Sequence, residues 1–164
     1  MWMSRFLLNR IAEDFGLGVS FAPKLFPDWN GAGCHTNFSD LKMRTGEDGM
    51  EHIYQMCRKL QDKHKLHIML YGDNANRLTG HHETSSKESF SFGVGNRAAS
   101  VRIPTDVAAN NGKGYIEDRR PASEIDPYVV AAMIIDTTSN DSSMAADLVA
   151  HYRDWMEYKL KEKL

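Results

Sequence analysis

Four short polar stretches contain most of the residues of this chain that could carry out chemistry. Together they offer an imidazole, carboxylates and several guanidinium groups, which an apolar core would not need. A guanidinium group stays charged and binds phosphate or carboxylate oxygens through paired hydrogen bonds. Phosphoryl transfer is the simplest use of such a set, because it depends on positioning and on neutralising charge. The stretches are residues 30–35, 76–83, 96–102 and 117–120.

Two residues of these stretches have the donor atoms of a divalent metal site. His35 offers a ring nitrogen and Glu117 a carboxylate, a pair that suits Mg²⁺ or Mn²⁺ when further carboxylates join it. Their separation along the chain leaves open whether they meet. Considered alone, a histidine in a glycine loop is more often a structural hydrogen-bonding residue, and a single arginine is usually a surface group.

The composition predicts one compact domain and excludes some partners. A chain of 164 residues with 41% hydrophobic residues can bury a substantial core, but it is short for two domains. The net charge of -2 leaves no basic stripe, so we expect no nucleic acid partner. Cys34 and Cys57 lack the spacing of a disulfide framework, which favours a reducing, cytoplasmic location. Because no apolar run reaches membrane-spanning length, we expect a soluble protein that does not bind membranes.

Hydrophobic periodicity and turn residues predict the elements that would position the polar stretches. Apolar residues at helical spacing predict helices at residues 2–15, 47–64 and 144–163. Short extended runs predict strands at residues 19–21, 35–38, 67–71 and 99–103. Asp126 followed by Pro127 predicts the start of a further helix. The polar segment 72–95 has no clear period, and long ordered loops of this kind are usually functional.

A series of longer motifs runs along the chain. They read WNGAGCHTN at 29–37, DNA at 73–75, RLTG at 77–80, HETS at 82–85, NR at 96–97, RIP at 102–104 and GYIEDRRP at 114–121. Together these motifs make the chain resemble glutamine synthetases of the eukaryotic type. The motifs occur in the family's order and close to its spacing, and the resemblance runs from about residue 2 to about residue 135. Several motifs in one order argue against coincidence.

The resemblance implies an ATP-dependent ligase that joins ammonia to L-glutamate through a γ-glutamyl phosphate intermediate. ATP and Mg²⁺ or Mn²⁺ would be its cofactors. It implies an α/β fold, of the α+β kind, that forms part of the glutamine synthetase catalytic domain, with a curved antiparallel sheet and flanking helices. Residues 1–136 would form the catalytic segment and residues 137–164 a divergent C-terminal helix. Because the family site lies at a subunit boundary, we expect a homo-oligomer or association with a full-length subunit.

The resemblance also implies a role for individual residues. His35 and Glu117 would bind the metal. Glu83 would belong to a flap that closes the site and accepts a proton from ammonium, with Arg97 and Arg119 as further catalytic residues. Residues for glutamate would be Asn30, Gly31 and Arg77, and those for the nucleotide Asn37, Ser39, Arg44, Arg97, Arg102 and Tyr115.

The family is considerably longer than this chain, and that difference leaves alternatives open. The acidic strands that supply most of the family's metal-binding glutamates have no counterpart here, so we expect the isolated chain to bind metal weakly and to show little ligase activity. One alternative is a catalytically incomplete glutamine synthetase-like subunit that binds nucleotide or a full-length partner. Another is an acyl-phosphate ligase that acts on an amine rather than on ammonia.

Overall fold

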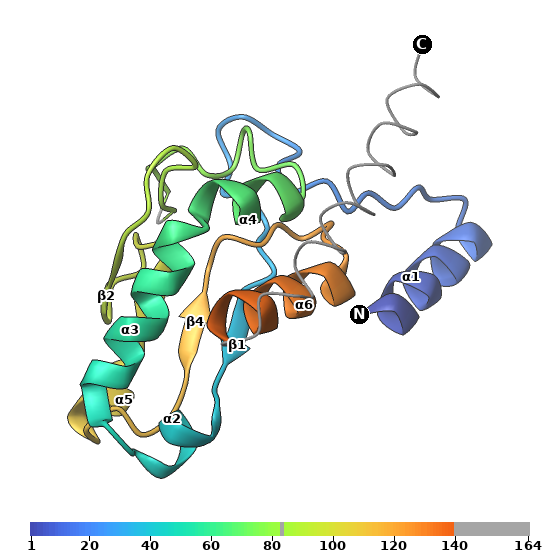
Figure 1. Ribbon diagram of the computed structural model, residues 1–164. Coiled ribbons are helices and arrows are strands. Elements are labelled where there is room, and N and C mark those ends of the chain that lie inside the picture. The colour runs from blue at the N-terminus through green and yellow to red at the C-terminus, as the bar shows by residue number, and fades with distance from the viewer. Residues whose placement is uncertain (83, 140–164) are drawn as a thin grey trace.

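The computed structural model describes residues 1–82 and 84–139, which form the predicted α/β fold (Figure 1). Glu83 and the predicted helix at residues 144–163 lie outside the described residues. The helices are α1 (Trp2–Asp14), α2 (Leu41–Thr45), α3 (Gly49–Asp62), α4 (His64–Leu70), α5 (Thr105–Ala109) and α6 (Pro127–Thr138). The strands are β1 (Thr36–Phe38), β2 (Phe92–Val94), β3 (Val101–Ile103) and β4 (Ile116–Asp118).

The strands form one open, four-stranded sheet in the order β1-β4-β3-β2. The pairs β1–β4 and β3–β4 are antiparallel, as predicted, but β2 and β3 run parallel. The sheet is therefore mixed rather than wholly antiparallel. The reason lies in the connection between β2 and β3, which turns at Gly95 with a φ of +65° and returns the chain to the end where β2 began.

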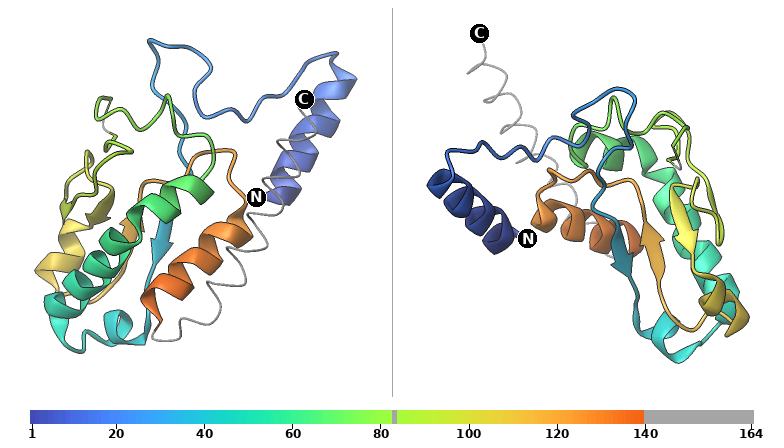
Figure 2. Two further views of the ribbon diagram at one scale, coloured as in Figure 1. Left: turned by 45° about the horizontal axis from the view of Figure 1, so that its top comes forward. Right: turned by 180° about the vertical axis from the view of Figure 1, so that it is seen from behind.

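One face of the sheet is covered by helices. Val101, Ile103 and Ile116 are buried against the apolar stripe of α3, which the helical spacing of that segment predicted. A second cluster joins α4 and α6, and Phe38 of β1 packs against both clusters. Both α3 and α6 thus lie on the same side of β1 and β4 (Figure 2). Side chains that point to the other face of the sheet do not belong to this core and can form a polar site.

Most of the segment predicted as a strand at residues 67–71 is helical instead, since α4 runs to Leu70 and Tyr71 is its C-cap. In a helix, His67, Leu70 and Tyr71 share a face, and all three are buried, whereas Met69 remains 57% exposed. A strand would have placed Met69 beside Tyr71 on the inner face. A short apolar run fits either periodicity, so the pattern alone could not decide. The predicted strand at residues 19–21 is also absent, because that segment is irregular in the structure.

Helix α1 forms where the sequence predicts it, but none of its residues is buried. Its apolar residues Trp2, Phe6 and Ile11 are 49%, 58% and 56% exposed. The guanidinium group of Arg5 attaches the helix to the loop before α6, because it donates to the carbonyl oxygens of residues 123 and 125 at 2.6 and 2.9 Å. Helix α1 consequently stands at the edge of the molecule, beside the start of α6 (Figures 1 and 2).

Helix α6 begins at the predicted cap. The Asp126 carboxylate accepts a hydrogen bond from the Tyr128 amide at 2.9 Å, and Pro127 occupies the first turn.

None of the helices in the described part of the chain is long and apolar enough to cross a membrane.

Candidate functional site

A row of polar side chains crosses the face of the sheet that the α3 core does not cover. The register places Asn37 of β1 opposite Glu117 of β4, and Glu117 opposite Arg102 of β3. Residues directly opposite one another in neighbouring strands have their side chains on the same face. The row follows from strand alternation, because the neighbours Ile116 and Asp118 point to the buried side.

Glu117 and His35 lie in contact at the centre of this row, although 82 residues separate them along the chain. His35 Nδ1 is 3.2 Å from Glu117 Oε1. Arg119 Nη1, which can only donate, lies 3.5 Å from the same Nδ1, but the Glu117 carboxylate is closer and can only accept. We therefore assign the proton to Nδ1, which leaves the lone pair on Nε2. Burial and the charge of Arg119 lower the pKa of His35, which favours its neutral form. A neutral imidazole beside an ionised carboxylate is a suitable pair of ligands for a divalent cation.

Two guanidinium groups surround the other oxygen of Glu117. Arg102 Nε donates to Oε2 at 2.5 Å, and Arg119 Nη1 lies 3.3 Å from the same atom. Burial of Glu117 opposes ionisation, but the hydrogen bond from Arg102 and the charge of Arg119 outweigh it and hold the pKa of Glu117 below its ordinary value. The carboxylate is therefore ionised at neutral pH and already shared by two cations.

Arg77 approaches the same site from the segment after α4, and its side chain is 4% exposed. Its Nη2 donates to the carbonyl oxygens of Arg119, Arg120 and Pro121 at 3.0, 2.8 and 2.9 Å. Burial and the charge of Arg119 lower the pKa of Arg77 to about 10, so the group keeps its charge at neutral pH. One nitrogen of the guanidinium group, Nη2, thus holds the chain that leaves β4.

The site has two of the ligands that a divalent cation needs. Within residues 1–82 and 84–139, no group of three or more histidine, cysteine, aspartate or glutamate side chains could hold a metal ion. His35 and Glu117 still fit Mg²⁺ or Mn²⁺, because these ions often combine one or two protein ligands with water and phosphate oxygens. Arg102 and Arg119 suit the phosphate groups that would complete such a site.

Comparison with known proteins decides the family. No protein-family model matches the chain. The glutamine synthetase of Schizosaccharomyces pombe is 58% identical over 139 residues, which cover 84% of this chain and 38% of that protein. That of Candida glabrata is 57% identical over 139 residues, with coverages of 84% and 37%. That of Debaryomyces hansenii is 54% identical over 154 residues, with coverages of 93% and 41%.

The chain belongs to the glutamine synthetase family. It spans between 37% and 41% of the length of these three relatives. Of the residues to which the resemblance assigns a role in a glutamine synthetase site, the structure brings together His35, Asn37, Arg77, Arg102, Glu117 and Arg119.

The remaining residues predicted for a glutamine synthetase site lie around this group or apart from it. Asn30 is exposed in the glycine loop, and Arg97 is exposed in the connection between β2 and β3. Ser39 and Tyr115 lie at the opposite end of the β1–β4 ladder from His35, because β1 and β4 run antiparallel. Arg44 is exposed on α2, while Glu83 lies outside the described residues. Their roles stay predictions.

Gly31, which the glutamine synthetase resemblance assigns to glutamate, has no room for a side chain. A methyl group there would lie 2.7 Å from Arg77 Cγ and 2.9 Å from the carbonyl oxygen of Pro23. We expect Gly31→Ala to lower the free energy of unfolding by about 1–3 kcal/mol, because Arg77 and the loop must move apart. Denaturant unfolding with Gly18→Ala as control measures this, since nothing lies within 4 Å of a methyl group at Gly18. Equal midpoints for the two variants would contradict the close approach.

A buried polar network behind the candidate site was not predicted. Arg120 is 0% exposed and binds Asp118 through two hydrogen bonds, Nε–Oδ1 at 2.8 Å and Nη2–Oδ2 at 2.7 Å. Its Nη1 and Nη2 lie 3.3 Å from His64 Nδ1 and 3.1 Å from His67 Nδ1. Strand alternation gives the signal that could have found this network, because residues 118 and 120 must face away from 117 and 119.

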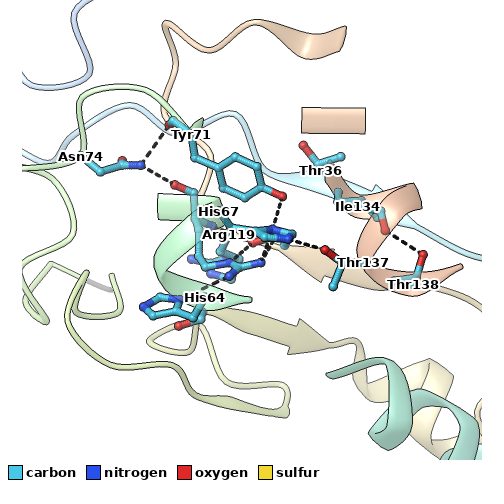
Figure 3. Close-up of polar contacts among 12 residues, drawn as sticks. Thr36, His64, His67, Tyr71, Asn74, Arg119, Ile134, Thr137 and Thr138 are labelled. Atoms are coloured by element: carbon cyan, nitrogen blue, oxygen red, sulfur yellow. Dashed lines mark hydrogen bonds and ion pairs between the residues drawn. The ribbon is translucent and has the colours of Figure 1, made fainter. Parts of the chain in front are cut away.

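His67 links this network to α6 (Figure 3). Because Arg120 can only donate, His67 Nδ1 must accept, and Nε2 carries the proton that it donates to Thr137 Oγ1 at 2.7 Å. The hydroxyl of Tyr71 lies 2.7 Å from the same Nδ1. Burial and the charge of Arg120 lower the pKa of His67 to about 3. The imidazole is therefore neutral in the folded protein.

The neutral state of His67 predicts a loss of stability in acid. Between its ordinary pKa of 6.5 and about 3, the unfolded chain binds a proton at His67 and the folded chain does not. The free energy of unfolding therefore falls as the pH falls through that range, by up to about 1.4 kcal/mol per pH unit from this group. Denaturant unfolding as a function of pH measures the slope. His67→Gln is expected to have a shallower slope than the unmodified chain, and identical slopes would exclude His67 as the source.

Proposed function

We propose that the chain takes part in the ATP-dependent ligation of ammonia to L-glutamate, and that it supplies the metal- and phosphate-binding side of the active site. The observation that carries this proposal is that His35, Arg102 and Arg119 all contact the carboxylate of Glu117. In this reaction the γ-carboxylate of glutamate attacks the terminal phosphate of ATP, and ammonia then displaces phosphate from the acyl phosphate. Both steps move negative charge that fixed cations can stabilise.

His35 and Glu117 would hold Mg²⁺ or Mn²⁺, and the bound ion would neutralise part of the negative charge of the phosphates. Arg102 and Arg119 now share the Glu117 carboxylate, and phosphate oxygens would compete with that carboxylate for them. Arg77 would orient a carboxylate of glutamate. Asn30 and Gly31 would line the same glutamate pocket.

The remaining roles rest on the family resemblance. Glu83 would close the site and take a proton from ammonium, which keeps water from the acyl phosphate. Arg97 would stabilise the phosphoryl group in transfer. The nucleotide would lie along the row that begins at Asn37, with Ser39, Arg44, Arg97, Arg102 and Tyr115 as its further contacts.

A second candidate is a catalytically incomplete glutamine synthetase-like subunit that binds nucleotide or a full-length partner. In the described part of the chain, the candidate metal site consists of His35 and Glu117. A site with so few carboxylates binds metal weakly, which favours the incomplete subunit. In either case we propose association with further subunits. The free cysteines Cys34 and Cys57 support a cytoplasmic location, where thiols stay reduced.

Calorimetric titration with Mn²⁺ and ATP, followed by an assay for glutamine, tests the proposal. Binding of ATP that requires Mn²⁺ is expected for the purified chain, and absence of that binding would overturn the proposed site. Turnover by the chain alone would favour a complete ligase. Turnover or tighter binding only after addition of a full-length glutamine synthetase would favour the incomplete subunit.

A further inference from the structure

Asn74 is a buried polar residue to which neither the sequence nor the family resemblance assigns a role. Its side chain is 3% exposed and lies in the segment that follows α4. Its Nδ2 donates to the carbonyl oxygens of Tyr71 and Arg120 at 3.0 and 2.9 Å (Figure 3). Its Oδ1 accepts a hydrogen bond from Arg77 Nε at 3.1 Å. The amide therefore has a fixed orientation, with its oxygen turned to Arg77.

The contacts of Arg77 leave one nitrogen for a ligand. Nε is held by Asn74, and Nη2 by the carbonyl oxygens of residues 119, 120 and 121. Nη1 donates to no acceptor among residues 1–82 and 84–139. A methyl group added at Gly33 would lie 3.1 Å from Arg77 Nη1 and 2.9 Å from His35 Nε2. Both nitrogens thus border the same small space beside the glycine loop.

We propose that Asn74 is a positioning residue, which fixes the Arg77 guanidinium so that Nη1 binds a carboxylate of the amino-acid substrate beside His35. The inference rests on the proposed function, because glutamate is the ligand that it gives to Nη1. A donor held in place before the ligand arrives avoids the cost of ordering a long side chain during binding. The plane of the guanidinium is set by Asn74 at one end and by the backbone at the other.

Two substitutions separate this role from a merely structural one. Asn74→Asp and Asn74→Ala both remove the Nδ2 donor, and with it the bonds to residues 71 and 120. Only Asn74→Ala also removes the acceptor for Arg77 Nε. We expect Asn74→Ala to weaken glutamate binding about tenfold and Mn²⁺–ADP binding little, because a hydrogen bond to a charged group is lost at the glutamate side alone. Asn74→Asp is expected to keep glutamate affinity within about threefold of the unmodified chain.

The experiment combines calorimetry with nuclear magnetic resonance. Titrations with L-glutamate and with Mn²⁺–ADP give the two affinities, and Asn9→Ala on the exposed surface of α1 serves as control. The Arg77 Nε–H resonance, identified by its loss in Arg77→Lys, is expected to shift in Asn74→Ala and to persist in Asn74→Asp.

The outcomes distinguish the inference from the proposed function. Equal losses of glutamate and nucleotide affinity in Asn74→Ala, or an unchanged Arg77 resonance, would overturn the positioning role alone. An unmodified chain that binds neither ligand would overturn the proposed function, and the inference with it.

Discussion

Asp118→Ala is expected to lower the free energy of unfolding by about 3–5 kcal/mol, the largest loss of stability that we expect from a single substitution in this chain. Asp118 is 1% exposed and Arg120 is 0% exposed, so removal of the carboxylate leaves a buried cation without its counter-ion. The charge of Arg120 and its hydrogen bonds hold the pKa of Asp118 below its ordinary value, in spite of complete burial that would raise it. Denaturant unfolding followed by circular dichroism measures the loss.

A matched control for Asp118 is available on the surface. Asp48 also pairs with a cation, Lys42 Nζ at 2.6 Å, but both side chains are about half exposed. Asp48 has a left-handed backbone with a φ of +59°, which asparagine tolerates better than alanine, so the control variant is Asp48→Asn. Water replaces such an exposed pair at little cost, and we expect Asp48→Asn to unfold at nearly the same denaturant concentration as the unmodified chain. Similar midpoints for Asp118→Ala and Asp48→Asn would show that burial does not distinguish the two pairs.

Glu117→Gln is expected to weaken Mn²⁺ binding by roughly tenfold or more, because it replaces the ionised carboxylate that lies beside His35 with a neutral amide of the same shape. The substitution also removes the charge that Arg102 and Arg119 now share. Calorimetry with Mn²⁺ measures the affinity, in the presence and absence of ATP.

Glu51→Gln is the control for this experiment, since Glu51 is an exposed carboxylate in the first turn of α3. It is expected to leave Mn²⁺ affinity unchanged. If Glu117→Gln also leaves it unchanged, the metal binds somewhere other than beside His35, and the proposed site is wrong. A circular dichroism spectrum of each variant shows whether it remains folded.

Periodicity predicted the elements in which many residues repeat one pattern. Helix α3 has an apolar stripe over several turns, and α6 has a cap whose chemistry is local, so both were found from sequence. His67–Tyr71 was assigned to a strand because five residues are too few to distinguish the helical period of about 3.6 residues from the strand period of about two. Its helical form depends on contacts with Arg120 and Thr137, which are distant in sequence.

The candidate site was predictable by residue type but not by geometry. The resemblance named His35, Glu117 and Arg102, yet only the pairing of β4 with β1 and β3 places them in one row. Arg77 was expected as a carboxylate clamp, and the structure engages its Nη2 with three backbone oxygens and its Nε with Asn74 Oδ1. Sequence alone could not separate these uses, because both require a guanidinium group.

The alternation of residues 117–120 between the two sides of the sheet constrains how this segment can change during evolution. Glu117 and Arg119 face the candidate site, whereas Asp118 and Arg120 form the buried pair. Deleting a single residue here would exchange the two sets, so that Glu117 and Arg119 would enter the core and the core pair would reach solvent. This segment can therefore accept some replacements of individual side chains, but we expect insertions and deletions within it to prevent the chain from folding.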